Sequence, residues 1–194
     1  MSEAEVLAEF RAAGALLEGH FILSSGLHSP RYLQCARVLM EPARASRLAQ
    51  ALAASIPAAV RERIDIVVSP AMGGVIIGHE MGRALGVEAV FVERPQGVFE
   101  LRRGFRLAAG QRVLLVEDVV TTGLSSREAM KAIAEAGGEA IAAAALVDRS
   151  NGAADLGVPF FPLIRLDVPS YEAAELPPEL AALPAEKPGS RKAA

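Results

Sequence analysis

The sequence is poor in cysteine and in long apolar runs. Its 194 residues include one cysteine, Cys35, so the chain can form no internal disulfide and no cysteine-based zinc site. A single cysteine is typical of a reducing compartment, and we expect a cytoplasmic protein. No apolar run reaches the roughly 18 residues that a membrane span needs. The acidic, amphipathic start MSEAEVLAEF is unlike a signal peptide. We therefore expect no membrane partner.

Positive charge is also scarce. Lys and Arg number 20 against 23 Asp and Glu, which gives a net charge of −3. The chain thus lacks the basic excess typical of nucleic-acid binding, and we expect no nucleic-acid partner. The three histidines have no metal-ligand spacing, and we expect them to be structural or surface residues. Any anionic ligand must be bound by a local cluster of donors.

Apolar residues are plentiful, and their pattern predicts the fold class. They make up 52% of the chain, enough for one domain with a sizeable core. From residue 64 onward, short apolar runs alternate with helical segments, which predicts an α/β protein with a mainly parallel sheet flanked by helices. Strands are expected at 64–69, 87–94, 112–118, 139–149 and 160–166, and crossover helices at 73–86 and 125–138.

The N-terminal part has a different pattern. Ser2 with Glu5 forms a capping box that predicts a first helix, with an apolar face extending to Leu16 and Leu17. Two short strands are expected around Ser25-Gly26 within 19–34. A helix should follow from Pro42 to about Ile56.

The C-terminal stretch from Pro177 is rich in Pro and Ala and has no periodic apolar face. We expect residues 177–194 to be a flexible tail, after a single domain at 1–176.

Polar residues directly follow four of the predicted strands. They are Ser69-Pro70-Ala71, Glu93-Arg94, Glu117-Asp118 and Asp148-Arg149. Ligands of parallel sheets bind beyond the carboxyl ends of the strands. We therefore expect one site that draws on all four.

The stretch VLLVEDVVTTGLSS (113–126) is the most informative of these. Its hydroxyls and backbone N–H groups converge at a helix start, where the helix dipole favours an anion such as a phosphate. Gly123 permits a positive φ and a close backbone approach. Glu117 and Asp118 would repel a phosphate, so we expect them to accept hydrogen bonds from sugar hydroxyls or to hold Mg²⁺ through water. The alternative is two solvated acids before an ordinary serine-capped helix.

Other phosphate-binding motifs are missing. The sequence has no G-x-x-x-x-G-K-[ST], and GGVIIG is not G-x-G-x-x-G.

VLLVEDVVTTGLSS resembles the phosphoribosyl-diphosphate (PRPP) signature of the type I phosphoribosyltransferases. Four further segments resemble the orotate phosphoribosyltransferases within that family. They are GHFILSSGLHSPRYLQC (19–35), SPAMGG (69–74), ERPQGVFELRRGF (93–105) and ALVDRSNG (145–152). The similarity extends from about residue 5 to 165.

This resemblance implies a type I phosphoribosyltransferase fold, with a small base-binding hood at about 1–40 and a mobile loop at about 94–111. It implies transfer of ribose 5-phosphate from PRPP to orotate with Mg²⁺, in a homodimer whose loop reaches the neighbouring site. Two alternatives stay open: a phosphoribosyltransferase for another base, and a non-catalytic regulator that senses PRPP.

The resemblance also implies roles for individual residues. Glu117 and Asp118 would hold the ribose hydroxyls and, indirectly, Mg²⁺. The remaining PRPP contacts would be Arg94, Ala71, Met72, Gly73, Val119, Val120, Thr121, Thr122, Gly123, Leu124 and Ser125. Orotate would be bound by Thr121, Arg149, Tyr32 and Ser24.

Two of these assignments have plain alternatives. Arg149 could simply pair with Asp148, and Tyr32 could be an ordinary core aromatic.

Three lysines common in the family are replaced here, by Ser24, Gly73 and Val98. Between Phe91 and Arg112, however, five arginines face two glutamates, a local charge of +3. We hypothesise that Arg102 or Arg103 takes over the catalytic role of the loop lysine. The alternative is a solvated loop without a catalytic role.

Overall fold

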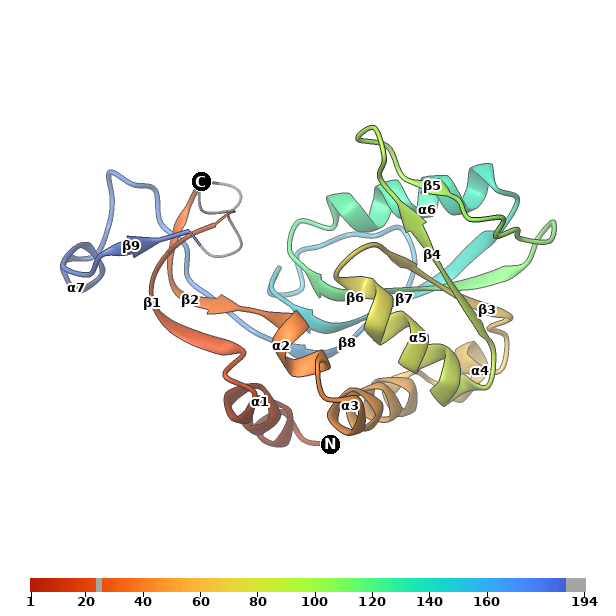
Figure 1. Cartoon of the computed structure of the whole chain (residues 1–194), viewed down its shortest axis with the longest axis horizontal. Helices are drawn as coiled ribbons and strands as arrows, with labels where there is room; N and C mark the ends of the chain where they lie inside the picture. The colour runs from red at the N-terminus through yellow and green to blue at the C-terminus, as the bar shows by residue number, and fades with distance from the viewer. Residues whose placement is uncertain (24–25, 188–194) are drawn as a thin grey trace.

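A six-stranded sheet and a smaller lobe beside it make up the chain (Figure 1). The structure is a computed structural model, and it describes residues 1–23 and 26–187. None of the helices in these two ranges is long and apolar enough to cross a membrane.

The central sheet is parallel except at one edge. Its order is β5-β4-β3-β6-β7-β8, and only β4 and β5 are antiparallel. The strands are β3 (Ile66–Pro70), β4 (Glu88–Glu93), β5 (Glu100–Leu101), β6 (Arg112–Val120), β7 (Glu139–Asp148) and β8 (Phe160–Arg165). From β3 the chain builds outward to β4, and then returns to add β6 on the other side. The switch point between β3 and β6 is where such sheets bind ligands.

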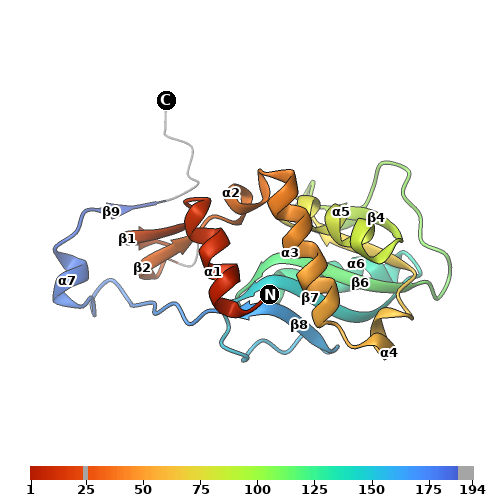
Figure 2. The same ribbon diagram turned by 90° about the horizontal axis from the view of Figure 1, so that it is seen from below.

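Helices cover both faces of this sheet, as the alternating pattern predicts. In Figures 1 and 2, α3 (Pro42–Ser55) and α5 (Gly74–Leu85) lie on one face and α6 (Leu124–Glu135) on the other. The alanine-rich β7 is a strand although alanine favours helix, because it pairs with β6 and β8 and its last seven residues are all buried. Sheet burial therefore overrides local propensity.

Three short elements before residue 102 were not expected from the sequence. They are α2 (Cys35–Leu39), α4 (Ala58–Arg61) and β5. Each has five residues or fewer, which is too short for a periodic apolar pattern to develop.

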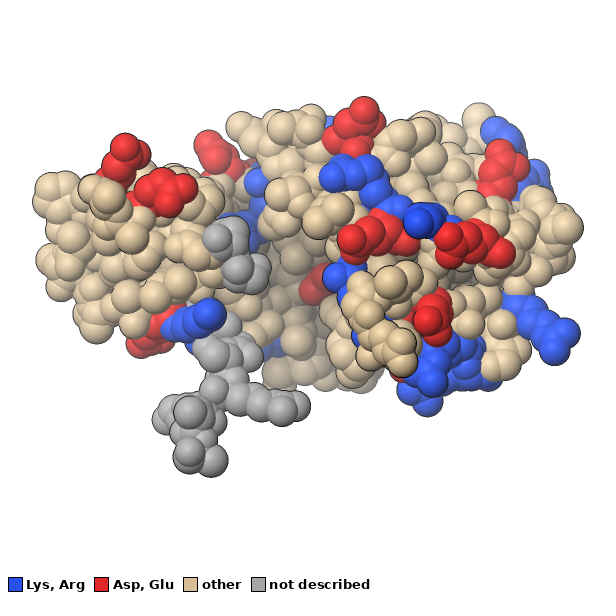
Figure 3. All heavy atoms as spheres, turned by 90° about the horizontal axis from the view of Figure 1, so that it is seen from above, with Lys and Arg blue, Asp and Glu red and all other residues tan. Residues whose placement is uncertain are grey.

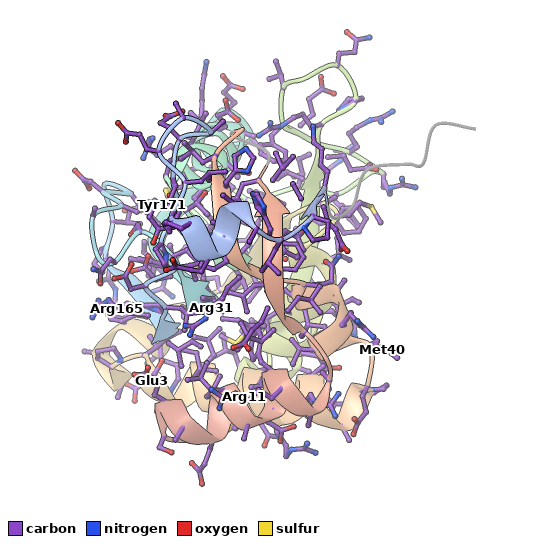
Figure 4. The ribbon with its side chains drawn as sticks, turned by 90° about the vertical axis from the view of Figure 1, so that its left-hand side faces the viewer. Glu3, Arg11, Arg31, Met40, Arg165 and Tyr171 are labelled. Atoms are coloured by element: carbon purple, nitrogen blue, oxygen red, sulfur yellow. The ribbon has the colours of Figure 1, made fainter. Side chains whose placement is uncertain are left out.

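The smaller lobe combines the two ends of the described chain. It contains β1 (Leu16–Ile22), β2 (His28–Leu33) and β9 (Ala185–Glu186), in the order β2-β1-β9. Next to them lie α1 (Glu3–Ala12) and α7 (Pro178–Ala181). Figure 4 views this lobe end-on, with Tyr171 near α7 and with α1, which carries Arg11, below.

Two expectations for this lobe need correction. The capping box of Ser2 and Glu5 is present, but the helix ends at Ala12, and Leu16 and Leu17 belong to β1. The positive φ of Gly14, 57°, turns the chain between the two elements.

The second correction concerns the expected flexible tail, because residues 177–187 pack onto the lobe. β9 pairs with β1, Leu180 is 3% exposed, and His20 Nδ1 is 3.0 Å from the carbonyl oxygen of Leu183. His20 is itself buried, with its Nε2 2.6 Å from Nδ1 of His28. These histidines are structural, as expected. A single apolar side chain and a two-residue strand leave no periodic signal in the sequence, which is why the packing was not predicted. Residues 188–194 lie outside the described part.

Candidate active site

The turn between β6 and α6 surrounds a cavity of about 210 Å³. Gly123 has φ 73°, the positive value expected for it, and directly precedes α6. The cavity is lined by Arg94, Glu117, Val119, Val120, Thr121, Thr122, Gly123, Leu124, Ser125, Ser126 and Glu128. Exposed hydroxyls and a helix start thus converge as predicted, and we call residues 121–125 the phosphate loop.

One donor of this loop is already engaged. The Leu124 N–H, expected to face the phosphate, donates to Thr122 Oγ1 at 3.3 Å. A phosphate would have to displace this weak contact, which costs little because the side chains of Thr122 and Leu124 are exposed.

Glu117 is the buried acid of the site. It is 7% exposed, and its Oε1 accepts a hydrogen bond from the buried Ser126 hydroxyl at 3.4 Å. Burial, and to a lesser degree the neighbouring charge of Asp118, raises the pKa of Glu117 to about 8. Without a ligand, Glu117 is therefore mainly protonated at neutral pH.

Asp118 lies on the other side of β6, because neighbouring strand residues point in opposite directions. Its Oδ1 accepts the N–H of Val119 at 2.9 Å, and burial raises its pKa. A Cβ placed on Gly73 would lie 2.7 Å from Asp118 Oδ2. The end of β3 and Asp118 therefore meet at the switch point, and at Gly73 only glycine leaves room for this carboxylate.

The segment Ala71-Met72-Gly73 follows β3 directly. The Ala71–Met72 peptide is cis, and the Met72 side chain is 85% exposed. Gly73 begins the turn into α5. The expected diphosphate loop thus lies at the end of a strand next to Asp118.

Arg149 follows β7 and is half-buried. Its backbone N–H donates to the Val120 carbonyl at 2.8 Å, so it lies at the end of β6 as well. Its side-chain Nε is buried and has no hydrogen-bond partner within the described residues. Burial lowers its pKa. A buried donor without a partner is costly, and an anionic ligand would remove that cost.

The simple alternative for Arg149, a pair with Asp148, is not found. The fully buried Asp148 instead accepts hydrogen bonds from Ser150 and lies 3.5 Å from Nε of Arg165.

Tyr32 and Ser24 were expected at the base. Tyr32 is partly buried in β2, stacks at a tilt on Phe21 with ring centroids 5.8 Å apart, and influences the pKa of Arg149. Tyr32 thus belongs to the lobe and lies near Arg149 at the end of β7. Ser24 lies outside the described residues.

Arg94 joins the cavity from the end of β4. It pairs with Glu128 of α6, and its guanidinium carbon lies 4.1 Å over the ring of the buried Phe99. In Figure 3, charges of both signs alternate over α6 and the loop beside it.

The two candidate catalytic arginines differ. Arg103 forms a two-bond pair with Glu93, at 3.0 and 2.7 Å, and has a positive φ of 58°. Arg102 is exposed and forms no ion pair in the described part of the chain. Arg94 and Arg112 pair with acids outside this segment, Glu128 and Asp65. Of the five arginines, Arg102 and Arg106 are therefore the two without an ion pair among the described residues.

Sequence reasoning missed three residues of α6 next to the phosphate loop: Ser126, Arg127 and Glu128. Each of them contacts part of the site through tertiary packing. The only sequence signal for them was their position in the first turn of a helix that follows the predicted phosphate-binding loop.

These features define a class of protein. A parallel sheet with a phosphate loop, two acids at the switch point and a small lobe over the strand ends is the arrangement of a type I phosphoribosyltransferase. A family model described as "Phosphoribosyl transferase domain" matches residues 38–156, more than half of the chain.

Proteins of similar sequence show which family within this class the chain belongs to. The chain is 76% identical over 193 residues to "Orotate phosphoribosyltransferase" of Rhizorhabdus wittichii, covering 100% of this chain and 98% of the relative. It is 58% identical over 192 residues to the protein of the same name from Caulobacter vibrioides, with 99% and 98% coverage. The chain belongs to the orotate phosphoribosyltransferase family.

Solved structures agree with this assignment. Orotate phosphoribosyltransferase from Aeropyrum pernix has a TM-score of 0.72 at 27% identity, covering 83% of this chain and 93% of that one. The Mycobacterium tuberculosis enzyme, in complex with inorganic phosphate, has a TM-score of 0.63 at 27% identity, covering 84% and 94%. Adenine phosphoribosyltransferase from Saccharomyces cerevisiae, at 20% identity and a TM-score of 0.65, shares the fold.

Proposed function

We propose that this chain transfers the ribose 5-phosphate group of PRPP to orotate, giving orotidine 5′-monophosphate and diphosphate. The observation that carries the proposal is the placement of a phosphate loop and a half-buried arginine at the ends of adjacent strands, β6 and β7. The Nε of this arginine, Arg149, has no hydrogen-bond partner among the described residues. A phosphorylated sugar and an anionic base could then be bound side by side.

The proposed binding mode follows from the strand ends. The phosphate loop takes the 5-phosphate, and Glu117 and Asp118 approach the ribose from the two sides of β6. In the proposed complex, Ala71, Met72 and Gly73 contact the diphosphate. Arg94, which lines the cavity at the phosphate loop, reaches the diphosphate from the end of β4. Arg149 and Thr121, with Tyr32 over them, meet orotate, because a guanidinium fork fits a carboxylate or a ring carbonyl edge.

Catalysis in this proposal depends on position and charge. The orotate ring nitrogen attacks the anomeric carbon of PRPP, its bond to the diphosphate oxygen breaks, and diphosphate carries the electron pair away. The ring nitrogen loses its proton as the new bond forms, and the departing diphosphate can accept it, so no strong base from the chain is required. The carboxylates favour the positive charge that develops on the ribose, while Arg94 and Arg102 meet the leaving diphosphate.

Mg²⁺ fits the donor set of this site. The described residues contain no group of three or more His, Cys, Asp or Glu side chains that could hold a metal alone. Two carboxylates plus substrate oxygens is, however, the usual arrangement for Mg²⁺. When bound through water to Glu117 and Asp118, it would add positive charge at the diphosphate.

We also propose a cytoplasmic homodimer in which loop 94–111 closes over the neighbouring site and keeps water out. The likeness to the family supports the dimer, and sedimentation velocity would test it.

A spectroscopic assay tests the function. Purified protein with PRPP and Mg²⁺ should consume orotate absorbance, and should turn over adenine, hypoxanthine and uracil far more slowly. Asp118→Asn should keep the fold and lose most of the activity, because a nearly isosteric change removes the charge at the ribose. PRPP binding without any turnover would favour a non-catalytic regulator that senses PRPP. Faster turnover of another base would favour a phosphoribosyltransferase for that base.

A further inference from the structure

Arg127 holds two separate loops together. It lies in the first turn of α6, and its Nη1 donates to two main-chain carbonyl oxygens. One belongs to Thr122 in the phosphate loop, at 3.2 Å, and the other to Asp155, at 2.9 Å. Asp155 lies in the loop of residues 149–159 between β7 and β8, which we call the Arg149 loop.

The Arg149 loop is firmly built where it begins. The Asp148 carboxylate accepts the N–H groups of Ser150 at 2.8 Å and Gly152 at 3.2 Å. The Ser150 hydroxyl accepts the N–H of Ala154 at 2.9 Å. These bonds tie residues 148–154 together, so the segment that carries Arg149 is linked to the residue just before Asp155.

The two loops are also in direct contact. Leu156 is 4% exposed, and a Cβ on Gly123 would lie 2.5 Å from its Cδ2. The N–H of Arg149 is bonded to Val120, the residue before the phosphate loop. The Arg149 loop thus contacts the phosphate loop at Leu156 and the residue just before it at Arg149, and Arg127 adds a charged bridge.

Arg127 itself is not placed to bind the phosphate. It is absent from the residues that line the 210 Å³ cavity in the described chain. The Thr122 carbonyl that it holds would repel an anion if it turned inward, so the bond keeps the loop in its anion-binding form. Its action on a ligand is therefore indirect.

We propose that Arg127 is a positioning residue that couples the two substrate sites, so that an occupied phosphate loop strengthens orotate binding at Arg149. This inference rests on the proposed function of the two loops. By linkage, orotate must strengthen binding at the phosphate loop by the same factor.

Calorimetry with ribose 5-phosphate tests the coupling, because this ligand can fill the phosphate loop but cannot react. In the wild-type protein, saturating ribose 5-phosphate should tighten orotate binding about fivefold or more. In Arg127→Gln the factor should fall close to one, while the affinity for ribose 5-phosphate alone should change less than about threefold. Arg127→Lys keeps the charge but lacks the planar fork, and should give an intermediate factor.

A matched control is Lys131→Gln on the same helix. Lys131 is 77% exposed and lies 3.8 Å from Glu135, so its loss removes the same charge one turn away. Its coupling should equal that of the wild type.

Equal coupling in wild type and Arg127→Gln, or no coupling in the wild type, would overturn the proposal. So would a loss of more than about tenfold in ribose 5-phosphate affinity with unchanged coupling, which would make Arg127 a direct ligand. If the wild type bound neither ligand, the proposed function would fail first, and this inference with it.

Discussion

Glu117 and Asp118 are neighbours in sequence but lie in different surroundings. Glu117 faces the phosphate cavity beside Ser126, and Asp118 faces Gly73. Because a buried acid next to a second acid resists ionisation, Glu117 should lose its proton only when a ligand supplies positive charge or hydroxyl donors.

The first prediction follows from the raised pKa of Glu117. Between its ordinary value of 4.5 and about 8 the folded protein binds more protons at Glu117 than the unfolded chain does. The free energy of unfolding therefore falls as pH rises through that window, by up to about 5 kcal/mol. Glu117→Gln should remove this fall, as measured by urea unfolding at about pH 5 and about pH 9.

Glu135→Gln is the control for this experiment. Glu135 is 61% exposed on the neighbouring helix, so its variant should keep the wild-type pH dependence. An undiminished fall in Glu117→Gln would mean that Glu117 is ionised in the free protein.

The second prediction concerns Arg149. Arg149→Ala should weaken orotate binding about ten- to a hundredfold, because a charge-assisted contact worth about 1.5–3 kcal/mol is lost. PRPP binding should stay near the wild-type value in calorimetry. The exposed Arg63 provides a control, since Arg63→Ala should alter neither affinity. An equal loss for both ligands would point to collapse of the site.

At the scale of elements, the segment between β4 and β6 is held at several points. β5 pairs with β4, and Phe99 is buried. The rings of Phe105 and Phe91 pack edge-on, with their centroids 5.3 Å apart. The Arg103–Glu93 pair adds to these contacts. That the segment moves on binding stays a prediction.

The third prediction separates the two loop arginines. Arg102→Ala should lower kcat by about 10²–10³, the effect of removing a group that stabilises charge in the transition state, with a smaller change in KM. Arg103→Ala should lower kcat less, because Arg103 is occupied by Glu93. Steady-state kinetics of the two variants would decide this, and a larger effect for Arg103 would reverse the assignment.

Long periodic elements could be predicted from the sequence, and short ones could not. The five longer strands of the central sheet and α3, α5 and α6 follow from apolar runs and from the alternation of strands with crossover helices. β5, α7 and β9 depend on contacts with distant residues. The residues of the site divide in the same way. The phosphate loop and the two acids belong to a sequence motif at the end of a strand, so they could be predicted. Ser126 and Arg127 contact the site through tertiary packing, which no local pattern encodes.

At the scale of the molecule, the lobe beside the sheet is a joint product of both ends of the described chain. The fourth prediction is that removal of residues 177–194 leaves the central sheet folded but loosens β1 and β2. The lobe would lose the burial of Leu180, worth about 1.5–3 kcal/mol, and the bond from His20 to Leu183.

Hydrogen exchange would measure this effect. Amides of residues 16–33 should exchange faster in the truncated protein, while those of β6 and β7 keep their protection. Orotate affinity should fall more than PRPP affinity. Unchanged exchange in 16–33 would show that β9 and α7 contribute nothing to the lobe.

The position of β9 also has a consequence for how the protein is made on the ribosome. Domains fold as they emerge, N-terminal parts first, at about 5–20 residues per second. The hairpin of β1 and β2 is synthesised early, yet the strand that completes its sheet, at Ala185–Glu186, is the last described element to leave the ribosome. The nascent chain should thus form its central sheet before its smaller lobe is complete, and the proposed binding of orotate should require that Ala185–Glu186 has emerged.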